Sequence, residues 1–143
     1  MIRPATLEDA AACARIMGAW VAETPWMPML HTPAEDHAFL CRLIGAGRVT
    51  VWDGAAGIDG FLSRAGTELG ALYVAACARG QGVGAALLDA AKRASPVLDL
   101  WTFEANTGAL RFYRREGFAE IGRTDGALNE ERLPDIRYRW TSK

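Results

Sequence analysis

The sequence predicts an α/β fold in which helices flank a mixed, mostly antiparallel central sheet. Short apolar runs alternate with segments whose apolar residues recur at helical spacing. Glycine-rich turns separate the apolar runs near residues 49–52 and 60–62, as expected for antiparallel neighbours. An apolar strand at 68–76, a helix at 82–94 and a strand at 97–103 then predict a parallel crossover unit.

The first half of the chain is predicted to add two helices. Residues 2–5 favour a short strand, and Thr6 is the expected N-cap of a helix at 10–21, because acidic residues follow it in the first turn. A second helix is expected at 34–46, where Gly47 is suited to the C-cap position.

The last third of the chain completes the predicted sheet. A helix is expected at 107–116, and Gly117 ends it. Strands follow at 118–123 and 136–140, joined by a polar, acidic connection at 125–135. With no repeat, low-complexity tract or linker, the sequence predicts a single domain at residues 1–143.

Composition excludes several classes of function. The chain has 143 residues and a net charge of −1, from 16 Lys and Arg against 17 Asp and Glu, so it has no general attraction for nucleic acid or anionic lipid. No uncharged apolar stretch reaches the roughly 18 residues of a membrane span, and no signal-peptide pattern begins the chain. Three cysteines without a CxxC pair favour a reduced, cytoplasmic protein without a zinc site.

The most informative segment, residues 72–88, passes from a buried strand through a glycine-rich turn into a helix. Glycines let the backbone approach a ligand, and a helix start offers free N–H groups, so the segment predicts an anion site for phosphate. Gly80, Gly82 and Ala85 match the dinucleotide pattern G-x-G-x-x-A, with Asp99 beyond them as a ribose ligand. Several strands precede this turn, however, and no Gly-Lys-Ser or Gly-Lys-Thr ends it as in a P-loop.

A second pattern fits the same turn. As R-x-x-G-x-G, residues Arg79, Gly82 and Gly84 resemble the acetyl-CoA pyrophosphate loop of the GNAT superfamily of N-acetyltransferases. Residues 106–118, NTGALRFYRREGF, resemble the other motif of that family, N-x-x-A-x-x-F-Y-x-x-x-G-F. The two motifs occur in the family's order, and the resemblance, closest over 69–118, implies a GNAT-like sheet with a splayed acetyl-CoA-binding strand pair.

The resemblance also implies how acetyl-CoA, the expected cosubstrate, is bound without a metal. The pantetheine arm is expected along the backbone edge of the strand before the loop, and the pyrophosphate on the amides of the loop. The implied cofactor-binding residues are Tyr73, Val74, Ala76, Arg79, Gly80, Gln81, Gly82, Val83, Gly84, Ala85, Asn106, Ala109 and Tyr113.

Catalytic roles follow from the same comparison. Tyr113 matches the family tyrosine that donates a proton or hydrogen bond to the departing CoA sulfur. An amine with a pKa of about 10.4 must lose a proton before it attacks, at a cost of about 4.6 kcal/mol at pH 7. Glu68 is similar in position to the family's glutamate base, while Asp99, Glu104 or a chain of waters are alternatives. Cys77, which lies beside the loop, is expected to be a small packing residue rather than a nucleophile.

The acceptor pocket is implied to form between the first helices and the C-terminal strands. Its predicted residues are Trp26, Met29 and His31 on one side, with Asp125 and Glu130 on the other. The acidic side favours a cationic amine, although a solvated loop explains the same residues.

Three functions follow from these observations. We expect direct acetyl transfer from acetyl-CoA to a small primary amine in a ternary complex. A protein-lysine acetyltransferase is an alternative within the same chemistry, and a non-catalytic acyl-CoA sensor is an alternative outside it. The resemblance also allows a homodimer, in which the C-terminal strand with Tyr138 and Trp140 could take part.

Overall fold

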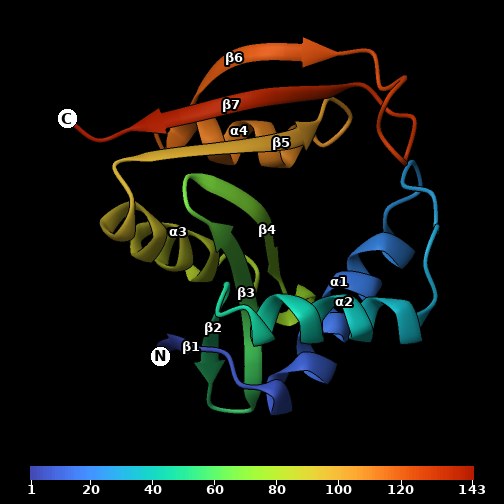
Figure 1. The fold of residues 1–143 in the computed structure, drawn as a ribbon, viewed down its shortest axis with the longest axis vertical. Helices are drawn as coiled ribbons and strands as arrows, with labels where there is room; N and C mark the ends of the chain where they lie inside the picture. The colour runs from blue at the N-terminus through green and yellow to red at the C-terminus, as the bar shows by residue number, and fades with distance from the viewer.

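Seven strands form one sheet in the order β1-β2-β3-β4-β5-β7-β6, with helices packed on both faces (Figure 1). This computed structural model describes residues 1–143, the whole chain. The strands are β1 (Ile2–Pro4), β2 (Val49–Gly54), β3 (Gly57–Ala65), β4 (Glu68–Val74), β5 (Val97–Phe103), β6 (Ala119–Thr124) and β7 (Asp135–Thr141). The helices are α1 (Ala10–Glu23), α2 (Pro33–Gly45), α3 (Val83–Ala94) and α4 (Thr107–Arg115), with short 3-10 helices at Leu7–Asp9 and Ala76–Ala78. The predicted mixed α/β fold is confirmed.

The central junction of the sheet is its one parallel pairing. All other neighbouring strands are antiparallel, whereas β4 and β5 run parallel and share a single register pair, Glu68 opposite Asp99. Beyond that pair the two strands diverge (Figure 1). β4 keeps its antiparallel pairing with β3 up to Val74, so its other edge is left without a strand partner. The expected splayed strand pair is therefore present.

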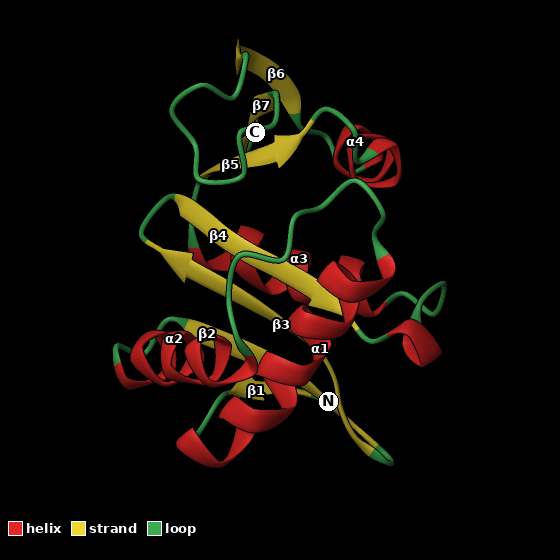
Figure 2. Cartoon of the chain, turned by 90° about the vertical axis from the view of Figure 1, so that its right-hand side faces the viewer, coloured by secondary structure: helices red, strands yellow, loops and turns green.

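Two hydrophobic layers hold the helices to the sheet. Leu87 of α3 and Leu98 of β5 belong to the larger layer, which α3 and α4 cover. Cys13 of α1 and Leu40 of α2 belong to the smaller layer on the opposite face. Figure 2 shows α1 and α2 beside β1 to β4, while α4 packs against β5 and β7. The sheet is therefore covered on both faces around β4, as its nearly continuous apolar sequence predicted.

Several element boundaries differ from those predicted. The strand expected at 60–62 extends over Gly57–Ala65, because pairing with β2 and β4 on both sides overrides the weak strand preference of its glycines. The strand expected to reach residue 76 ends at Val74, because the chain turns into the 3-10 helix Ala76–Ala78. The first helix continues to Glu23, just before the first proline of the following loop.

The C-terminal strand occupies an interior position in the sheet. β7 pairs with β5 on one side and with β6 on the other. Tyr138 is 1% exposed, and its hydroxyl accepts a hydrogen bond from Arg114 Nε at 3.1 Å. The sheet therefore buries the side chain of Tyr138, while the expected homodimer stays a prediction. No helix is both long and apolar enough to cross a bilayer.

Truncation of the α3 core should measure how strongly this layer holds the fold. Leu87 is fully buried, so Leu87→Ala removes apolar contacts and leaves a cavity, and we expect the free energy of unfolding to fall by about 2–5 kcal/mol. Leu128 is fully exposed, so Leu128→Ala is the matched control and should change it by less than about 0.5 kcal/mol. Urea denaturation of both variants measures the difference, and equal losses would contradict the layer assignment.

Candidate functional site

A cleft of about 640 Å³ opens where β4 and β5 diverge. Its walls come from these two strands, from the loop after β4, and from the start of α3 and one side of α4. The predicted cofactor residues that line it are Tyr73, Val74, Arg79, Gly80, Gly82, Val83, Gly84, Ala85, Asn106, Ala109 and Tyr113. The fold thus brings the two sequence motifs together around one cavity, while Ala76 and Gln81 lie outside its lining.

The glycine loop presents backbone rather than side chains to the cleft. Gly80 and Gly82 have φ values of 75° and 81°, in the left-handed region that other residues rarely adopt. Gly82 is the N-cap of α3, and its carbonyl accepts the N–H of Ala86 at 3.0 Å. The N–H groups of residues 83–85 precede that bond and have no partner within the helix. This end of the cleft is suited to an anion, since the helix dipole adds a partial positive charge.

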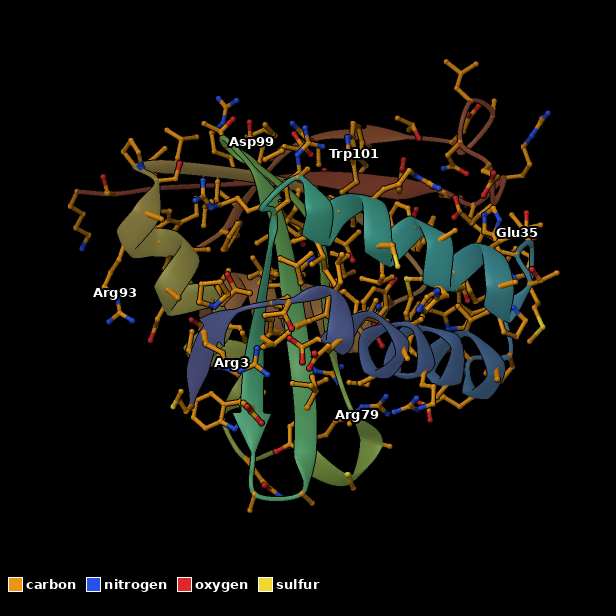
Figure 3. The ribbon with its side chains drawn as sticks, turned by 60° about the horizontal axis from the view of Figure 1, so that its bottom comes forward. Arg3, Glu35, Arg79, Arg93, Asp99 and Trp101 are labelled. Carbon is orange, nitrogen blue, oxygen red and sulfur yellow. The ribbon has the colours of Figure 1, made fainter.

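Two arginines add positive charge to the cleft. Arg79, labelled in Figure 3, forms an ion pair with Glu23 at 2.5 Å, and its Nε donates a hydrogen bond to the Val74 carbonyl at 3.2 Å. The guanidinium of Arg115 lies 5.6 Å from the ring centre of Phe112, which also lines the cleft. Sequence reasoning missed Arg115, although its spacing of three residues from Phe112 on a helix was a usable signal.

The start of α4 is fixed by a side-chain cap. Asn106 Oδ1 accepts a hydrogen bond from the Ala109 N–H at 3.1 Å, as predicted for a helix cap. This bond holds the first turn of α4 against the cleft, where Asn106 and Ala109 both belong to the lining. The cap therefore positions the helix that carries Tyr113.

Tyr113 is buried at the base of the cleft. It is 7% exposed and packs against Phe112 and Phe118, with ring centres 5.2 and 5.4 Å away. Burial raises the pKa of its hydroxyl far above the ordinary value, and negative charge on Tyr73 would raise it further. Tyr113 is therefore a neutral phenol at working pH, able to donate a hydrogen bond into the cleft.

The carboxylates considered as catalytic bases lie elsewhere. Glu68 accepts two hydrogen bonds from Arg137, at 2.6 and 2.7 Å. Asp99, labelled in Figure 3, accepts two from Arg139 at 2.7 and 2.9 Å, and these bonds hold the pKa of Asp99 below its usual value. None of the three candidates, which include the exposed Glu104, lines the cleft. The structure does not bring them together with Tyr113.

Aromatic side chains border the cleft on the side of α1. Trp26, in the loop after α1, meets Trp20 edge-on with ring centres 5.8 Å apart, and meets Phe103 of β5 at 6.0 Å. Trp20 in turn contacts Tyr73 of β4 at 5.5 Å. Trp26 therefore anchors the loop against α1 and β5, and its partners Trp20 and Phe103 belong to the cleft lining.

A second cavity, called here the outer cavity, lies between α1, α2 and the loop that joins them. It has a volume of about 580 Å³, and Met29 and His31 line it. His31 Nε2 lies 2.6 Å from Glu130 Oε1, so two predicted acceptor residues from distant segments meet. Asp125 lines neither cavity, and its carboxylate instead accepts the Ala127 N–H within its own loop. Trp26 and Glu130 border these spaces without lining them.

Residues 34–120 match the family model described as the acetyltransferase (GNAT) domain. The chain belongs to the GNAT family. Two curated N-acetyltransferases match part of it. An uncharacterized N-acetyltransferase of Methanocaldococcus jannaschii is 33% identical over 91 residues, which are 60% of this chain and 40% of the relative. The peptidyl-lysine N-acetyltransferase YjaB of Salmonella typhimurium is 36% identical over 66 residues, 46% of each chain. The chain thus spans less than half the length of either relative.

Two solved structures share the fold. The apo form of YjaB from Escherichia coli has a TM-score of 0.81 at 22% identity, covering 100% of this chain and 98% of that one. The structure of yncA from Salmonella typhimurium, described with its cofactor acetyl-CoA, has a TM-score of 0.74 at 21% identity, covering 100% of this chain and 94% of that one.

The contact between His31 and Glu130 predicts that part of the stability of the fold depends on pH. The hydrogen bond to Glu130 raises the pKa of His31, so the pair stabilises the fold fully below about pH 6.5, the ordinary histidine value. This contribution is lost as the pH rises through the raised pKa of the folded state. In Glu130→Gln we expect the His31 titration midpoint, measured by NMR, to move down. Glu131→Gln is the control, and an equal shift in both variants would contradict the pairing.

Proposed function

We propose that this protein is an acetyl-CoA-dependent N-acetyltransferase that transfers the acetyl group directly to a primary amine. The observation that carries the proposal is the cleft between β4 and β5, with an anion-binding helix start at one end and the buried phenol of Tyr113 at its base. Family membership supports the same chemistry. A sensor that only binds acyl-CoA needs the glycine loop, but it does not need a phenol facing the thioester.

The proposed binding mode uses the backbone that the sheet leaves free. The pantetheine arm would pair with the open edge of β4 at Tyr73 and Val74, as an added strand does. The pyrophosphate would accept hydrogen bonds from the loop and from residues 83–85. Arg79 now bonds to the Val74 carbonyl, so it would release that oxygen to the arm and turn to the phosphates. Arg115 would supply a second cation.

In the proposed reaction the neutral amine nitrogen attacks the thioester carbonyl carbon. The new C–N bond forms, the C–S bond breaks, and the sulfur leaves as a thiolate. Tyr113 donates a hydrogen bond to that sulfur. Because burial raises the phenol pKa well above the roughly 8.5 of a thiol, the phenol keeps its proton and the thiolate is protonated by solvent.

The base for this reaction is a separate question. Glu68 remains a hypothesis from the family resemblance, but both of its oxygens already accept bonds from Arg137 and it lies outside the cleft lining. A chain of ordered water molecules can accept the proton without a free carboxylate in the cleft. The proton of the amine would then leave through ordered water toward the open side of the cleft.

A primary amine is the proposed acceptor. The aromatic side chains of Trp20, Trp26 and Phe103 can stabilise an approaching ammonium group by cation–π contacts. Met29, His31, Asp125 and Glu130 stay proposed as more distant acceptor residues. A lysine side chain of another protein is a second candidate, favoured by the name of the Salmonella relative, a peptidyl-lysine N-acetyltransferase. A homodimer in the cytoplasm stays a prediction.

The decisive test combines acetyl-CoA binding with turnover. We expect calorimetry to detect acetyl-CoA binding, and CoA release with at least one acceptor among polyamines, amino acids, aminoglycosides and lysine peptides. Tyr113→Phe should lower kcat by about 10–100-fold and leave binding intact, since a hydrogen bond to a charged group contributes about 1.5–3 kcal/mol. Binding without any turnover would favour the sensor, and no binding would contradict the site.

Glu68→Gln separates the two hypotheses for the base. If Glu68 only holds Arg137, the variant should keep kcat within about threefold of wild type, because the reacting atoms do not touch it. If Glu68 is the base, kcat should fall by about 100-fold or more, the size expected for general base catalysis. Thermal unfolding of the same variant shows how much of any change comes from the lost ion pair.

A further inference from the structure

Trp101, labelled in Figure 3, is the only exposed tryptophan among the five in the chain, and the reaction proposed above does not use it. Its side chain is 49% exposed and lines the cleft from β5. Leu100 belongs to the layer that α3 and α4 cover, so the alternation of the strand places Trp101 on the opposite face of the sheet. An aromatic ring left half exposed in the wall of a cavity offers apolar contact area to a ligand.

The ring of Trp101 is held in place by its neighbour across the sheet. Arg137 lies directly opposite Trp101 on β7, and its guanidinium carbon lies over the ring, 5.2 Å from the ring centre. Glu68 accepts two hydrogen bonds from the same guanidinium, at 2.6 and 2.7 Å, so the position of the cation is fixed. The ion pair between Glu68 and Arg137 therefore fixes the ring of Trp101 as well.

The guanidinium covers only one face of that ring. It also lies 3.5 Å from a carboxylate oxygen of Asp99, so it sits on the side of Trp101 that faces the start of β5. The other face of the ring turns toward Phe103, two residues further along the same face of the strand. Side chains at this spacing stand about 7 Å apart, which is roughly twice the contact distance of 3.5 Å between carbon atoms. One flat ring fits between them.

Charge favours a neutral ring over an ammonium group on the open face of Trp101. A cation already lies on the covered face, so a second cation would compete with it for the same ring electrons and be repelled by it. A neutral aromatic ring gains stacking contact without that repulsion. No carboxylate lines the cleft, so a ligand with several ammonium groups would find no ion-pair partner there.

Resting on the acetyl transfer proposed above, we propose that the acceptor is a primary amine that carries a flat aromatic ring, and that Trp101 binds this ring. The ring stacks between Trp101 and Phe103. The amine then lies along the aromatic wall that continues from Phe103 to Trp26, whose ring centres are 6.0 Å apart. Arg137 and Glu68 are positioning residues, because they act on the acceptor through Trp101.

The test compares amines that differ in ring shape. 2-Phenylethylamine and 2-cyclohexylethylamine share the two-carbon linker, but only the first ring is flat, and spermidine and an Nα-acetylated lysine peptide complete the panel. With acetyl-CoA at pH 8, we expect kcat/KM for phenylethylamine to exceed that for cyclohexylethylamine by about 5–10-fold. Trp101→Leu should lower kcat/KM for phenylethylamine by about 10-fold, mainly through KM, and abolish the preference. Trp101→Phe keeps a ring and should retain it.

Matched variants separate recognition from general damage to the fold. Trp140 also has a cation near its ring, with Lys92 Nζ 5.3 Å from the ring centre, but it lies outside the cleft lining, so Trp140→Leu should keep the wild-type preference. Arg137→Ala should raise KM for phenylethylamine and leave KM for cyclohexylethylamine unchanged. A merely structural role of Arg137 would move both values alike. Thermal unfolding of each variant shows that it is folded.

The outcomes distinguish this inference from the activity on which it rests. Turnover of spermidine or the lysine peptide, with no preference for the aromatic amine, would overturn the aromatic acceptor and leave acetyl transfer standing. An aromatic preference that survives Trp101→Leu would overturn the role of Trp101. Acetyl-CoA binding without CoA release by wild type with any of these amines would overturn the substrate class together with the proposed activity.

Discussion

The single register pair between β4 and β5 is the constraint on which the site depends. At that point Arg137 and Arg139, on one face of β7, bind Glu68 of β4 and Asp99 of β5 through paired hydrogen bonds of 2.6–2.9 Å. Arg137 reaches past β5 to hold the first residue of β4. Beyond this tie no strand pairing joins β4 and β5, so the sheet opens there. The tie gives Glu68 a structural role at the junction of β4 and β5.

The opening leaves polar backbone unpaired at the centre of the sheet. An interior strand normally satisfies its N–H and C=O groups on both edges, and leaving them unsatisfied costs free energy unless water or a ligand replaces the partner. β4 is therefore poised to accept an extended ligand, and the Arg79 side chain already uses one of its carbonyls. The glycine loop follows directly after β4, so its free N–H groups extend the row of unpaired backbone groups that a ligand can bind.

The turns and helix caps could be predicted from the sequence, because they depend on short-range patterns of residues. Gly82 at the start of α3 and Asn106 at the start of α4 were identified because turns and caps have short-range signatures. The pairing of Glu68 with Arg137 could not be predicted, because it joins residues 69 positions apart across an intervening strand. For the same reason the sequence did not predict that the strand order buries Tyr138. Contacts that depend on strand order have no signature in the order of residues.

The placement of charge separates the two ends of the site. Arginines and helix N–H groups line the cleft, while the carboxylates Asp36 and Glu131 line the outer cavity. A polyanion and a cation would thus approach from opposite sides and meet in a cleft lined by phenols and aromatic rings. Within such a space neither carboxylates nor imidazoles compete for the amine, so its proton must leave through a hydroxyl or through water. In the proposed reaction the phenol of Tyr113 and ordered water would therefore do more of the chemistry than Glu68, which lies outside the cleft lining.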